Sequence, residues 1–366
     1  MSSTRWGAWR ISFEHGAPAP WRVIPGGDLE AMLAEGAGLW QYLRGARIFI
    51  TGGTGFFGGW LLESLLHANE KLCLQAEATV LTRDEAAFLK DRPHLAASAA
   101  VRFHRGDVRS FAFPQGRYSH IIHAATAASA RLNAEDPGLM RDTIVQGTRR
   151  VLEFAGACGA QRLLFTSSGA VYGKQPEAMT HIPEDFAATH DAAPSAYAEG
   201  KRTAEALCAD FSRRHGLRTL IARGFAFVGP GLPLDTHFAI GNFIRDAIAG
   251  RPIEVRGDGT TYRSYLYGAD LAVWLWTILL RGESGRPYNV GSERRVHMLE
   301  LARIVARVLK PELAIHVAQS AQPGKPPEQY VPSTLRARTE LGLRETVALE
   351  DAIRRTAQWA AGGLNS

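Results

Sequence analysis

A phenol and an ammonium group stand four residues apart in the segment Tyr197-Ala-Glu-Gly-Lys201. The residues from about 195 to 215 have a pattern typical of a helix, and side chains four residues apart on a helix lie on one face. A cation beside a tyrosine favours the phenolate and lowers its pKa, so Tyr197 is a candidate general base near neutral pH. The same pair arises by chance on many helices, so it indicates acid–base chemistry only in combination with other motifs.

Hydroxyl groups form a second candidate feature upstream of this pair. The apolar run Leu163-Leu-Phe-Thr166 leads into Ser167, Ser168 and a loop of small residues. Ligands of open α/β sheets bind at the carboxyl ends of the strands, which is where this loop would expose its hydroxyls. The alternative is that both serines only form the loop.

A glycine-rich turn is the third feature. In Thr51-Gly-Gly-Thr-Gly-Phe-Phe-Gly-Gly59, glycines at 52, 55 and 58 separate a predicted strand at 47–51 from a predicted helix at 60–68. A pyrophosphate approaches backbone N–H groups closely at a helix N-terminus, and a Cβ would block that approach. Glycine-rich turns are common for steric reasons alone, but the position between a strand and a helix favours dinucleotide binding.

The ends of the second and third predicted strands should contact the adenosine half of such a cofactor. An acidic residue after the second strand indicates NAD, and an arginine indicates NADP. Thr82 stands where the acid is expected and Arg83 follows, which favours NADP, although Asp84 could turn toward the ribose. Asp107 after the third strand could accept a hydrogen bond from adenine, or it could be a turn residue.

The elements that position these residues alternate between short apolar runs and longer helical stretches, which predicts a parallel sheet with crossover helices. Strands are expected at 47–51, 78–82, 101–104, 120–124, 162–166 and 218–222. Helices are expected at 60–68, 140–158, 195–215, 241–249, 269–281, 298–309 and 347–360. The fold class is therefore α/β, a Rossmann-type doubly wound parallel sheet with a smaller C-terminal lobe for substrate.

Three parts follow from this pattern: an N-terminal extension at 1–45, a cofactor domain at 46–228, and a region at 229–366 that is mainly the substrate lobe, interleaved with the last sheet elements. The extension holds four of the eight tryptophans, Trp6, Trp9, Trp21 and Trp40. It also contains one expected helix from Asp28, as its N-cap, to Leu43.

Composition narrows the partners and the location. The longest apolar stretch, 271–280, is too short for a membrane span, and the first residues show no secretory signal. Three scattered cysteines predict neither disulfides nor a zinc site, which points to a cytoplasmic protein. The net charge of +6 is spread along the chain, so a solvated basic surface is expected and not a nucleic-acid partner.

Taken in order, these motifs resemble the extended short-chain dehydrogenases/reductases of the nucleotide-sugar epimerase/dehydratase group, over roughly residues 46–345. The resemblance rests on TGGTGFFG at 51–58, GDV at 106–108, HAAT at 123–126, TSSGAVYG at 166–173, YAEGK at 197–201, VGPG at 228–231 and GDGTTYRSYLYGADLA at 257–272. It implies a bound NAD(P) and a nucleoside-diphosphate sugar as the substrate.

The resemblance also implies roles for individual residues. Ser168 would contact O4 of the sugar, Tyr197 would be the acid/base, and Lys201 would hold the nicotinamide ribose and lower the pKa of the tyrosine. Arg263 falls where the family places an arginine on the nucleotide diphosphate. Asn242 falls where a contact to the same phosphates is made, and its alternative role is a helix N-cap.

Contacts to the cofactor are expected from the glycine turn, the next two strand ends, the HAAT motif and the fifth strand. These residues, beside Tyr197 and Lys201, are Gly52, Gly55, Phe56, Phe57, Gly58, Thr82, Arg83, Asp107, Val108, Ala124, Ala125, Thr126 and Thr166. Gly169 is expected beside the sugar, and no metal is expected. Family resemblance also suggests a homodimer formed through the helices at 140–158 and 195–215.

Departures from the family pattern bear on the reaction. Standard 4,6-dehydratases have Asp-Glu where this chain has Gly169 and Ala170, and one type of decarboxylation uses a glutamate at the second of these positions. Two asparagines that are usual in the family are replaced by Ile144 and Ala226. C4 epimerisation is therefore favoured over dehydration. The alternatives are an NADPH-dependent 4-keto-sugar reductase and, from another class, a non-catalytic dinucleotide sensor, against which the intact Tyr197 and Lys201 count.

Overall fold

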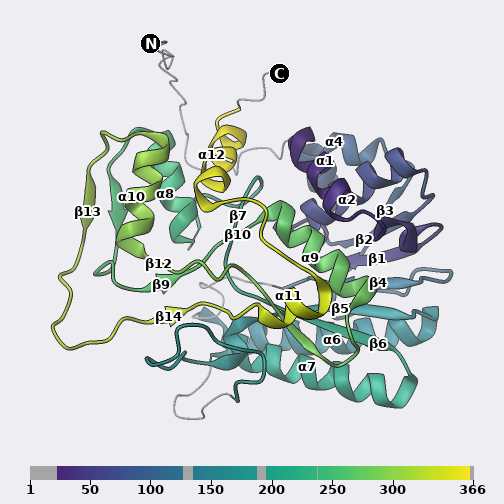
Figure 1. Ribbon diagram of the computed structural model, residues 1–366. Helices are drawn as coiled ribbons and strands as arrows, with labels where there is room; N and C mark the ends of the chain where they lie inside the picture. The colour runs from purple at the N-terminus through teal and green to yellow at the C-terminus, as the bar shows by residue number, and fades with distance from the viewer. Residues whose placement is uncertain (1–22, 127–134, 188–194, 237, 363–366) are drawn as a thin grey trace.

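The computed structural model describes residues 23–126, 135–187, 195–236 and 238–362, and its centre is a seven-stranded sheet (Figure 1). The strands lie in the order β11-β6-β5-β4-β1-β2-β3, and all neighbours are parallel. Their bounds are β1 Arg47–Thr51, β2 Glu77–Thr82, β3 Val101–Arg105, β4 His120–His123, β5 Arg162–Ser168, β6 Arg218–Gly224 and β11 Pro287–Val290. The order reverses between β1 and β4, which places the ligand-binding switch point there and confirms the predicted fold class.

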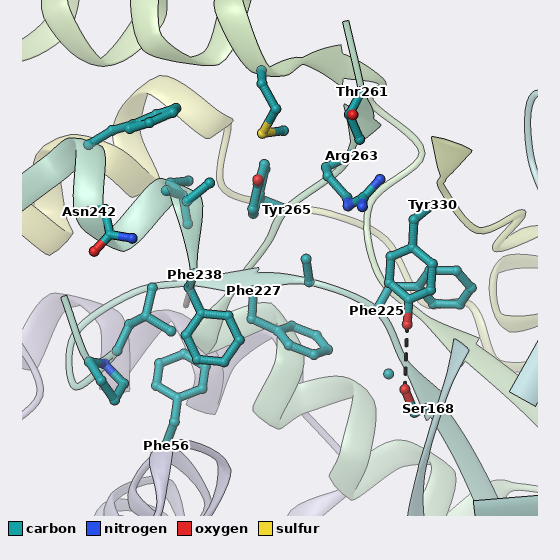
Figure 2. A pocket seen from close by; sticks show the side chains of 18 of the residues that line it. Phe56, Ser168, Phe225, Phe227, Phe238, Asn242, Thr261, Arg263, Tyr265 and Tyr330 are labelled. Carbon is teal, nitrogen blue, oxygen red and sulfur yellow. Dashed lines mark hydrogen bonds between the residues drawn. The ribbon is translucent and has the colours of Figure 1, made fainter. Parts of the chain in front are cut away.

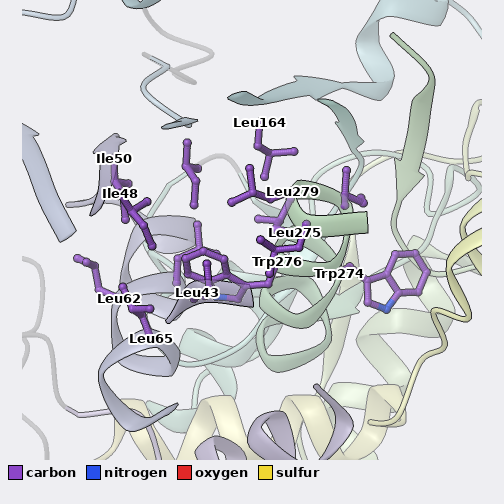
Figure 3. Packing of buried hydrophobic residues seen from close by; sticks show 14 of the residues in the cluster. Leu43, Ile48, Ile50, Leu62, Leu65, Leu164, Trp274, Leu275, Trp276 and Leu279 are labelled. Carbon is purple, nitrogen blue, oxygen red and sulfur yellow. The ribbon is translucent and has the colours of Figure 1, made fainter. Parts of the chain in front are cut away.

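Apolar residues of successive strand positions point to opposite faces of this sheet. Ile48 and Ile50 pack against helices α2 (Phe56–Leu72) and α9 (Gly268–Arg281) in one core cluster (Figure 3). Phe49, between them, packs in a separate cluster with helices α6 (Pro137–Cys158) and α7 (Ala196–His215). Burial on both faces explains why the strands are continuous apolar runs.

The helix ends follow the expected capping chemistry. Asp136 caps α6 by accepting a hydrogen bond from the Leu139 amide at 2.9 Å, and Ser195 caps α7 by accepting one from the Ala198 amide at 3.2 Å. Helix α7 ends at His215, and its C-cap Gly216 has a φ of +70°. Helix α2 begins at Phe56, four residues before the predicted start, because the glycine turn itself forms its N-terminus.

The C-terminal lobe is built on three amphipathic helices, α8 (Ala239–Ile248), α10 (Met298–Leu309) and α12 (Leu349–Ala360), whose core cluster also takes in residues of the neighbouring helices near the sheet. They stand apart from the sheet in Figure 1, together with the parallel pair β8 (Ile253–Val255) and β13 (Ile315–Val317). Short strands join this lobe to the sheet region: β7 Phe227–Val228, β10 Leu266–Tyr267, β9 Tyr262–Arg263, β12 Val296–His297 and β14 Gln329–Tyr330. The predicted domain boundary at residue 228 stays a prediction.

The longest apolar stretch of the chain, 271–280, forms the body of helix α9 and is buried throughout. It packs against α1 (Gly26–Glu35), α2 and the sheet, so its hydrophobicity serves the core of the protein. Within the described parts of the chain, no helix is long and apolar enough to cross a membrane.

The N-terminal extension differs from its prediction. Residues 28–43 form two elements, α1 and the 3₁₀ turn η1 (Trp40–Leu43), because the chain turns at Gly36 under the ring of Trp40. Asp28 is not an N-cap. It lies buried in the first turn of α1, where it accepts a hydrogen bond from the Tyr267 hydroxyl at 2.6 Å and one from Arg355.

Trp40, at the end of the N-terminal extension, belongs to the core of the protein. Trp40 packs edge-on against Trp276 in the core, with ring centroids 6.2 Å apart. Trp6, Trp9 and Trp21 lie outside the described residues.

Sequence reasoning also missed short helices that depend on tertiary contacts: α3 Glu85–Asp91, α4 Pro93–Ala96, η2 Gly169–Tyr172 and α11 Leu335–Leu341.

Candidate active site

A cavity of about 1240 Å³ lies between the carboxyl ends of the sheet strands and the C-terminal lobe. Its lining contains twelve of the predicted site residues: Gly52, Gly55, Phe56, Phe57, Ala124, Thr126, Thr166, Ser168, Tyr197, Lys201, Asn242 and Arg263. The others do not line it: Gly58, Thr82, Arg83, Asp107, Val108, Ala125 and Gly169. A volume of this size is ample for a dinucleotide or a sugar nucleotide.

The three glycines of the turn are required for different reasons. A Cβ at Gly52, where φ is +72°, would lie 2.5 Å from the Ala124 carbonyl, and a Cβ at Gly58 would lie 2.3 Å from Gly53 Cα. The missing side chains at Gly52 and Gly58 therefore allow neighbouring backbone segments to lie in direct contact. A Cβ at Gly55 would meet only the Gly52 carbonyl oxygen, at 3.5 Å, and would otherwise face the cavity. The absence of a side chain at Gly55 thus keeps the N-terminus of α2 open to the cavity, and its contact with a phosphate stays a prediction.

Lys201 is buried under the floor of the cavity. Its Nζ donates hydrogen bonds to Thr126 Oγ1 and to the Thr166 carbonyl, each at 2.7 Å, and lies 4.7 Å from the centre of the Phe165 ring. Burial lowers the pKa of this amine to about 7. The ammonium is therefore only partly populated near neutral pH.

Tyr197 and Ser168 meet above Lys201. The nitrogen of Lys201 lies 5.8 Å from the centre of the Tyr197 ring, so the helix spacing does place both groups on one face. Burial raises the pKa of the Tyr197 phenol, and its hydrogen bond with Ser168 acts in the opposite direction. The expected lowering of the tyrosine pKa by Lys201 is wrong for this structure, because burial dominates at both groups.

A second phenol approaches Ser168 from the C-terminal region, and sequence reasoning missed it. Tyr330, on the two-residue strand β14, places its hydroxyl 3.4 Å from Ser168 Oγ, and its ring packs against Phe225 with centroids 4.7 Å apart (Figure 2). Burial raises the pKa of Tyr330 far above its usual range. Ser168 therefore stands between two protonated phenols, Tyr197 and Tyr330.

The position directly after Ser168, Gly169, has no room for a larger side chain. A Cβ at Gly169 would lie 2.7 Å from the Phe225 ring and 2.8 Å from the Tyr330 hydroxyl. The Ala170 amide donates a hydrogen bond to Ser168 Oγ at 3.2 Å, which fixes the start of η2. Gly169, which we expected beside the sugar, is thus covered by Phe225 and Tyr330.

Ser167 differs from the expectation that both serines expose their hydroxyls. Its Oγ donates a hydrogen bond to Glu205 at 2.5 Å. Glu205 also accepts two hydrogen bonds from the guanidinium of Arg223, which in turn donates one to the Tyr172 hydroxyl. Ser167 and Ser168 both line the cavity, but the Ser167 hydroxyl is engaged by this buried network through Glu205.

Arg263 and Asn242 line the end of the cavity formed by the C-terminal lobe (Figure 2). The guanidinium of Arg263 lies 5.6 Å from the centre of the Tyr330 ring and donates a hydrogen bond to its neighbouring carbonyl, that of Tyr262, at 2.8 Å. The alternative role for Asn242 is wrong, because the N-cap of α8 is Phe238. The Asn242 amide nitrogen bonds instead to the Thr236 carbonyl at 2.9 Å.

The adenosine end of the predicted cofactor site has its own geometry. Arg83 and Arg105 line a hollow of about 500 Å³ at the ends of β2 and β3. Asp84 and Glu85 line the same hollow, and Asp84 Oδ1 also caps α3 by accepting a hydrogen bond from the Ala87 amide at 3.0 Å. The buried Thr82 hydroxyl bonds to the Asp84 carbonyl at 3.2 Å.

The carboxylate of Asp107 forms an ion pair with Arg109. Both of its carboxylate oxygens accept hydrogen bonds from the Arg109 guanidinium, at 2.9 and 3.0 Å, and this arginine lowers the pKa of Asp107 to about 2. The adjacent Val108 packs against Gly147 of α6. The predicted contact of Asp107 with adenine stays a prediction.

Comparison with known proteins agrees with this geometry. A model of the NAD dependent epimerase/dehydratase family matches residues 48–291. The chain belongs to this family. UDP-glucuronic acid decarboxylase 6 of Arabidopsis thaliana is 32% identical over 313 residues, which cover 84% of this chain and 86% of the plant protein. Family membership makes the protein an enzyme of the NAD dependent epimerase/dehydratase family.

Solved structures of the same class share the fold. UDP-glucose 4-epimerase from Thermus thermophilus is 25% identical, with a TM-score of 0.71, covering 87% of this chain and 100% of that one. A dTDP-glucose 4,6-dehydratase from Streptomyces venezuelae is 24% identical, with a TM-score of 0.73, covering 87% of this chain and 97% of that one. These likenesses span different reactions, so the choice of reaction depends on the residues of the site.

Proposed function

We propose that the protein is a C4 epimerase of a nucleoside-diphosphate sugar. The observation that carries this proposal is the pairing of Ser168 with Tyr197 at the cavity floor, next to Gly169 and Ala170, which have no side chain that transfers a proton. Epimerisation at C4 needs one acid/base and one oxygen ligand, and it needs no further proton donor or acceptor.

The residues of this chain fit a nicotinamide cofactor at the switch point. Gly55 keeps the N-terminus of α2 open for phosphate, and Lys201, with Thr126 and Thr166, would face the nicotinamide ribose. When bound, an oxidised cofactor supplies the hydride acceptor and a positive charge that favours ionisation of Tyr197. Tyr197 then takes the proton of the sugar hydroxyl and later returns it, while Ser168 holds the oxygen in place.

Decarboxylation and dehydration are less well supported by the site. The curated relatives include proteins named UDP-glucuronic acid decarboxylases, and the decarboxylation expected from the family uses a glutamate where this chain has Ala170. The Asp-Glu pair of the 4,6-dehydratases is also absent at 169 and 170. Phe225 and Tyr330 occupy the space into which a side chain at 169 would extend.

An NADPH-dependent 4-keto-sugar reductase is the second candidate, because Arg83 and Arg105 line one hollow at the adenosine end. Two guanidinium groups suit the 2′-phosphate of NADP, which is the cofactor we propose. A reductase would use Ser168, Tyr197 and Lys201 in the reverse direction.

A homodimer is part of the proposal and rests on the family resemblance. The expected interface is formed by α6 and α7, which pack side by side on one face of the sheet (Figure 1). Size-exclusion chromatography with light scattering would give the mass of two chains. A mass of one chain would contradict it.

Bound cofactor and turnover distinguish these candidates. The purified protein is analysed by mass spectrometry for nicotinamide and is then incubated with nucleoside-diphosphate sugars without added cofactor. An epimerase retains its cofactor and interconverts C4 epimers of equal mass. Consumption of NADPH only in the presence of a keto sugar would show a reductase. Ligand binding that survives in Tyr197→Phe, with no turnover in either protein, would show the sensor.

A further inference from the structure

The surroundings of the Ser168 hydroxyl are aromatic. Ser168 pairs with Gly224 in the register of β5 and β6. A Cβ at Gly224 would lie 3.2 Å from the Phe227 ring and 3.7 Å from the Phe57 ring. These two rings meet edge-on, with centroids 5.0 Å apart, and both line the cavity. One side of the reacting position is therefore covered by phenyl rings.

A third ring covers the other side. Phe225 lies over Gly169, where a Cβ would be 2.7 Å from its edge, and it is stacked between Tyr330 and Tyr172 at centroid distances of 4.7 and 6.2 Å. Figure 2 shows Phe225 and Tyr330 together at Ser168, with Phe227 between them and the remainder of the cavity. The Tyr330 and Tyr197 hydroxyls are polar atoms of this aromatic surround, and both contact Ser168.

Among the residues that the structure describes, the cations near Ser168, Phe225 and Tyr330 have other partners. Lys201 lies under Ser168 and donates to Thr126 and to the Thr166 carbonyl. The guanidinium of Arg223 forms its ion pair with Glu205 at 2.7 Å and does not line the cavity. In the described lining, Arg263 lies 5.6 Å from the centre of the Tyr330 ring, donates to the Tyr262 carbonyl, and is assigned to the diphosphate by the proposed function.

This environment discriminates among substituents at C6 of a hexose. C5 carries C6 and is bonded to C4, the carbon that Ser168 and Tyr197 address, so C6 lies against the walls around Ser168. A carboxylate there would lose its hydration to phenyl rings while Arg263 is engaged by the diphosphate, which is strongly unfavourable. A hydroxymethyl group loses a smaller hydration energy, and a methyl group gains from being buried.

We propose that the sugar accepted at this site is a 6-deoxyhexose, with a methyl group at C6, and that Phe225 and Phe227 select it. The proposal rests on the proposed function, because it assumes that Ser168 and Tyr197 address C4. It separates this protein from the relatives named for UDP-glucuronic acid, whose sugar carries a carboxylate at C6.

Calorimetry on the full-length protein with its cofactor tests the inference without requiring turnover. UDP, dTDP, CDP and GDP are first compared, and the tightest of them supplies the base. Its conjugates with glucose, 6-deoxyglucose and glucuronic acid are then titrated. We expect the 6-deoxyglucose conjugate to bind about tenfold more tightly than the glucose conjugate and about 100-fold more tightly than the glucuronic acid conjugate.

Variants test whether the aromatic rings cause this preference among C6 substituents. Phe225→Leu should lower the ratio of the two binding affinities, deoxy sugar over uronic acid, at least threefold. The smaller side chain lets water reach the space around Ser168. Phe238→Leu is the matched control, since Phe238 lines the cavity beside Phe56, away from Ser168 (Figure 2), and it should leave the ratio unchanged. If Phe225→Leu fails to fold, Phe227→Leu replaces it, and the ratios of the unmodified protein decide the matter.

The outcomes separate the two proposals. Uronic acid binding as tight as or tighter than that of the deoxy sugar would overturn the 6-deoxyhexose inference and leave the epimerase proposal standing. Binding of all three sugar conjugates no tighter than that of the nucleoside diphosphate alone would show that the sugar makes no productive contact. That result would overturn both proposals.

Discussion

The two sides of the cavity differ in how the chain builds them. The cofactor side uses groups close together in the sequence: the glycine turn directly after β1, and Tyr197 with Lys201 on one face of α7. The substrate side brings together Ser168, Phe225 and Tyr330, whose hydroxyl reaches Ser168 across 162 residues of chain. The predicted cofactor contacts and the proposed acid/base therefore come from local motifs. The walls of the proposed sugar site come from long-range packing.

Removing the acid/base should give the largest effect. Tyr197→Phe removes the group that exchanges the proton at O4, so we expect kcat to fall about 10³-fold. Cofactor binding should persist, because the Lys201 contacts with Thr126 and Thr166 do not involve the phenol. Steady-state kinetics and the nicotinamide content of the variant measure both effects. A kcat within tenfold of the unmodified protein would assign the proton transfer to another residue.

The glycine turn offers a pair of variants with opposite consequences. Gly58→Ala places a Cβ against Gly53, so it should lower the free energy of unfolding by about 2 kcal/mol or more. Gly55→Ala meets only ordinary contacts in the protein, so it should fold normally and bind the cofactor at least tenfold more weakly. Thermal unfolding and cofactor titration compare the two. Normal cofactor affinity in Gly55→Ala would contradict a phosphate at this turn.

Lys201 makes the cofactor side sensitive to pH. Its pKa is about 7 in the folded protein and near 10.5 in the unfolded chain, so only the unfolded state holds this proton between these values. The free energy of unfolding should therefore rise with pH across that window, by up to about 1.4 kcal/mol per pH unit. Lys201→Met lacks this titration. Denaturant unfolding of both cofactor-free proteins at pH 7, 8 and 9 measures the difference, and equal slopes would contradict it.

On the substrate side of the cavity, removal of the Tyr330 hydroxyl should have the smallest effect of the changes considered. Tyr330→Phe keeps the ring against Phe225 and removes only the hydroxyl that bonds to Ser168. We expect kcat to fall about fivefold, in line with the loss of one hydrogen bond of about 1 kcal/mol, with little change in stability. Kinetics of this variant beside Tyr197→Phe rank the two phenols. A loss as large as that of Tyr197→Phe would make Tyr330 a second acid/base.

The difference between local motifs and long-range packing also explains which features could be predicted from the sequence. The strands, the long helices and the pairing of Tyr197 with Lys201 follow from periodicity and spacing, which act over a few residues. Tyr330 carries no local signal, because β14 has only two residues and its position depends on pairing with β9. Ser167 and Asp28 were misread for a related reason, since their partners, Glu205 and Tyr267, come from distant segments.

The fate of a C4 label tests the central claim most directly. The protein, with no cofactor added, is given a nucleoside-diphosphate 6-deoxyhexose that carries deuterium at C4, and the product is analysed by NMR and mass spectrometry. Epimerisation through transient oxidation at C4 predicts an inverted C4 centre that retains the deuterium, with the mass unchanged. Loss of water or carbon dioxide from the product, or a reaction that proceeds only with added NADPH, would contradict the proposed epimerase.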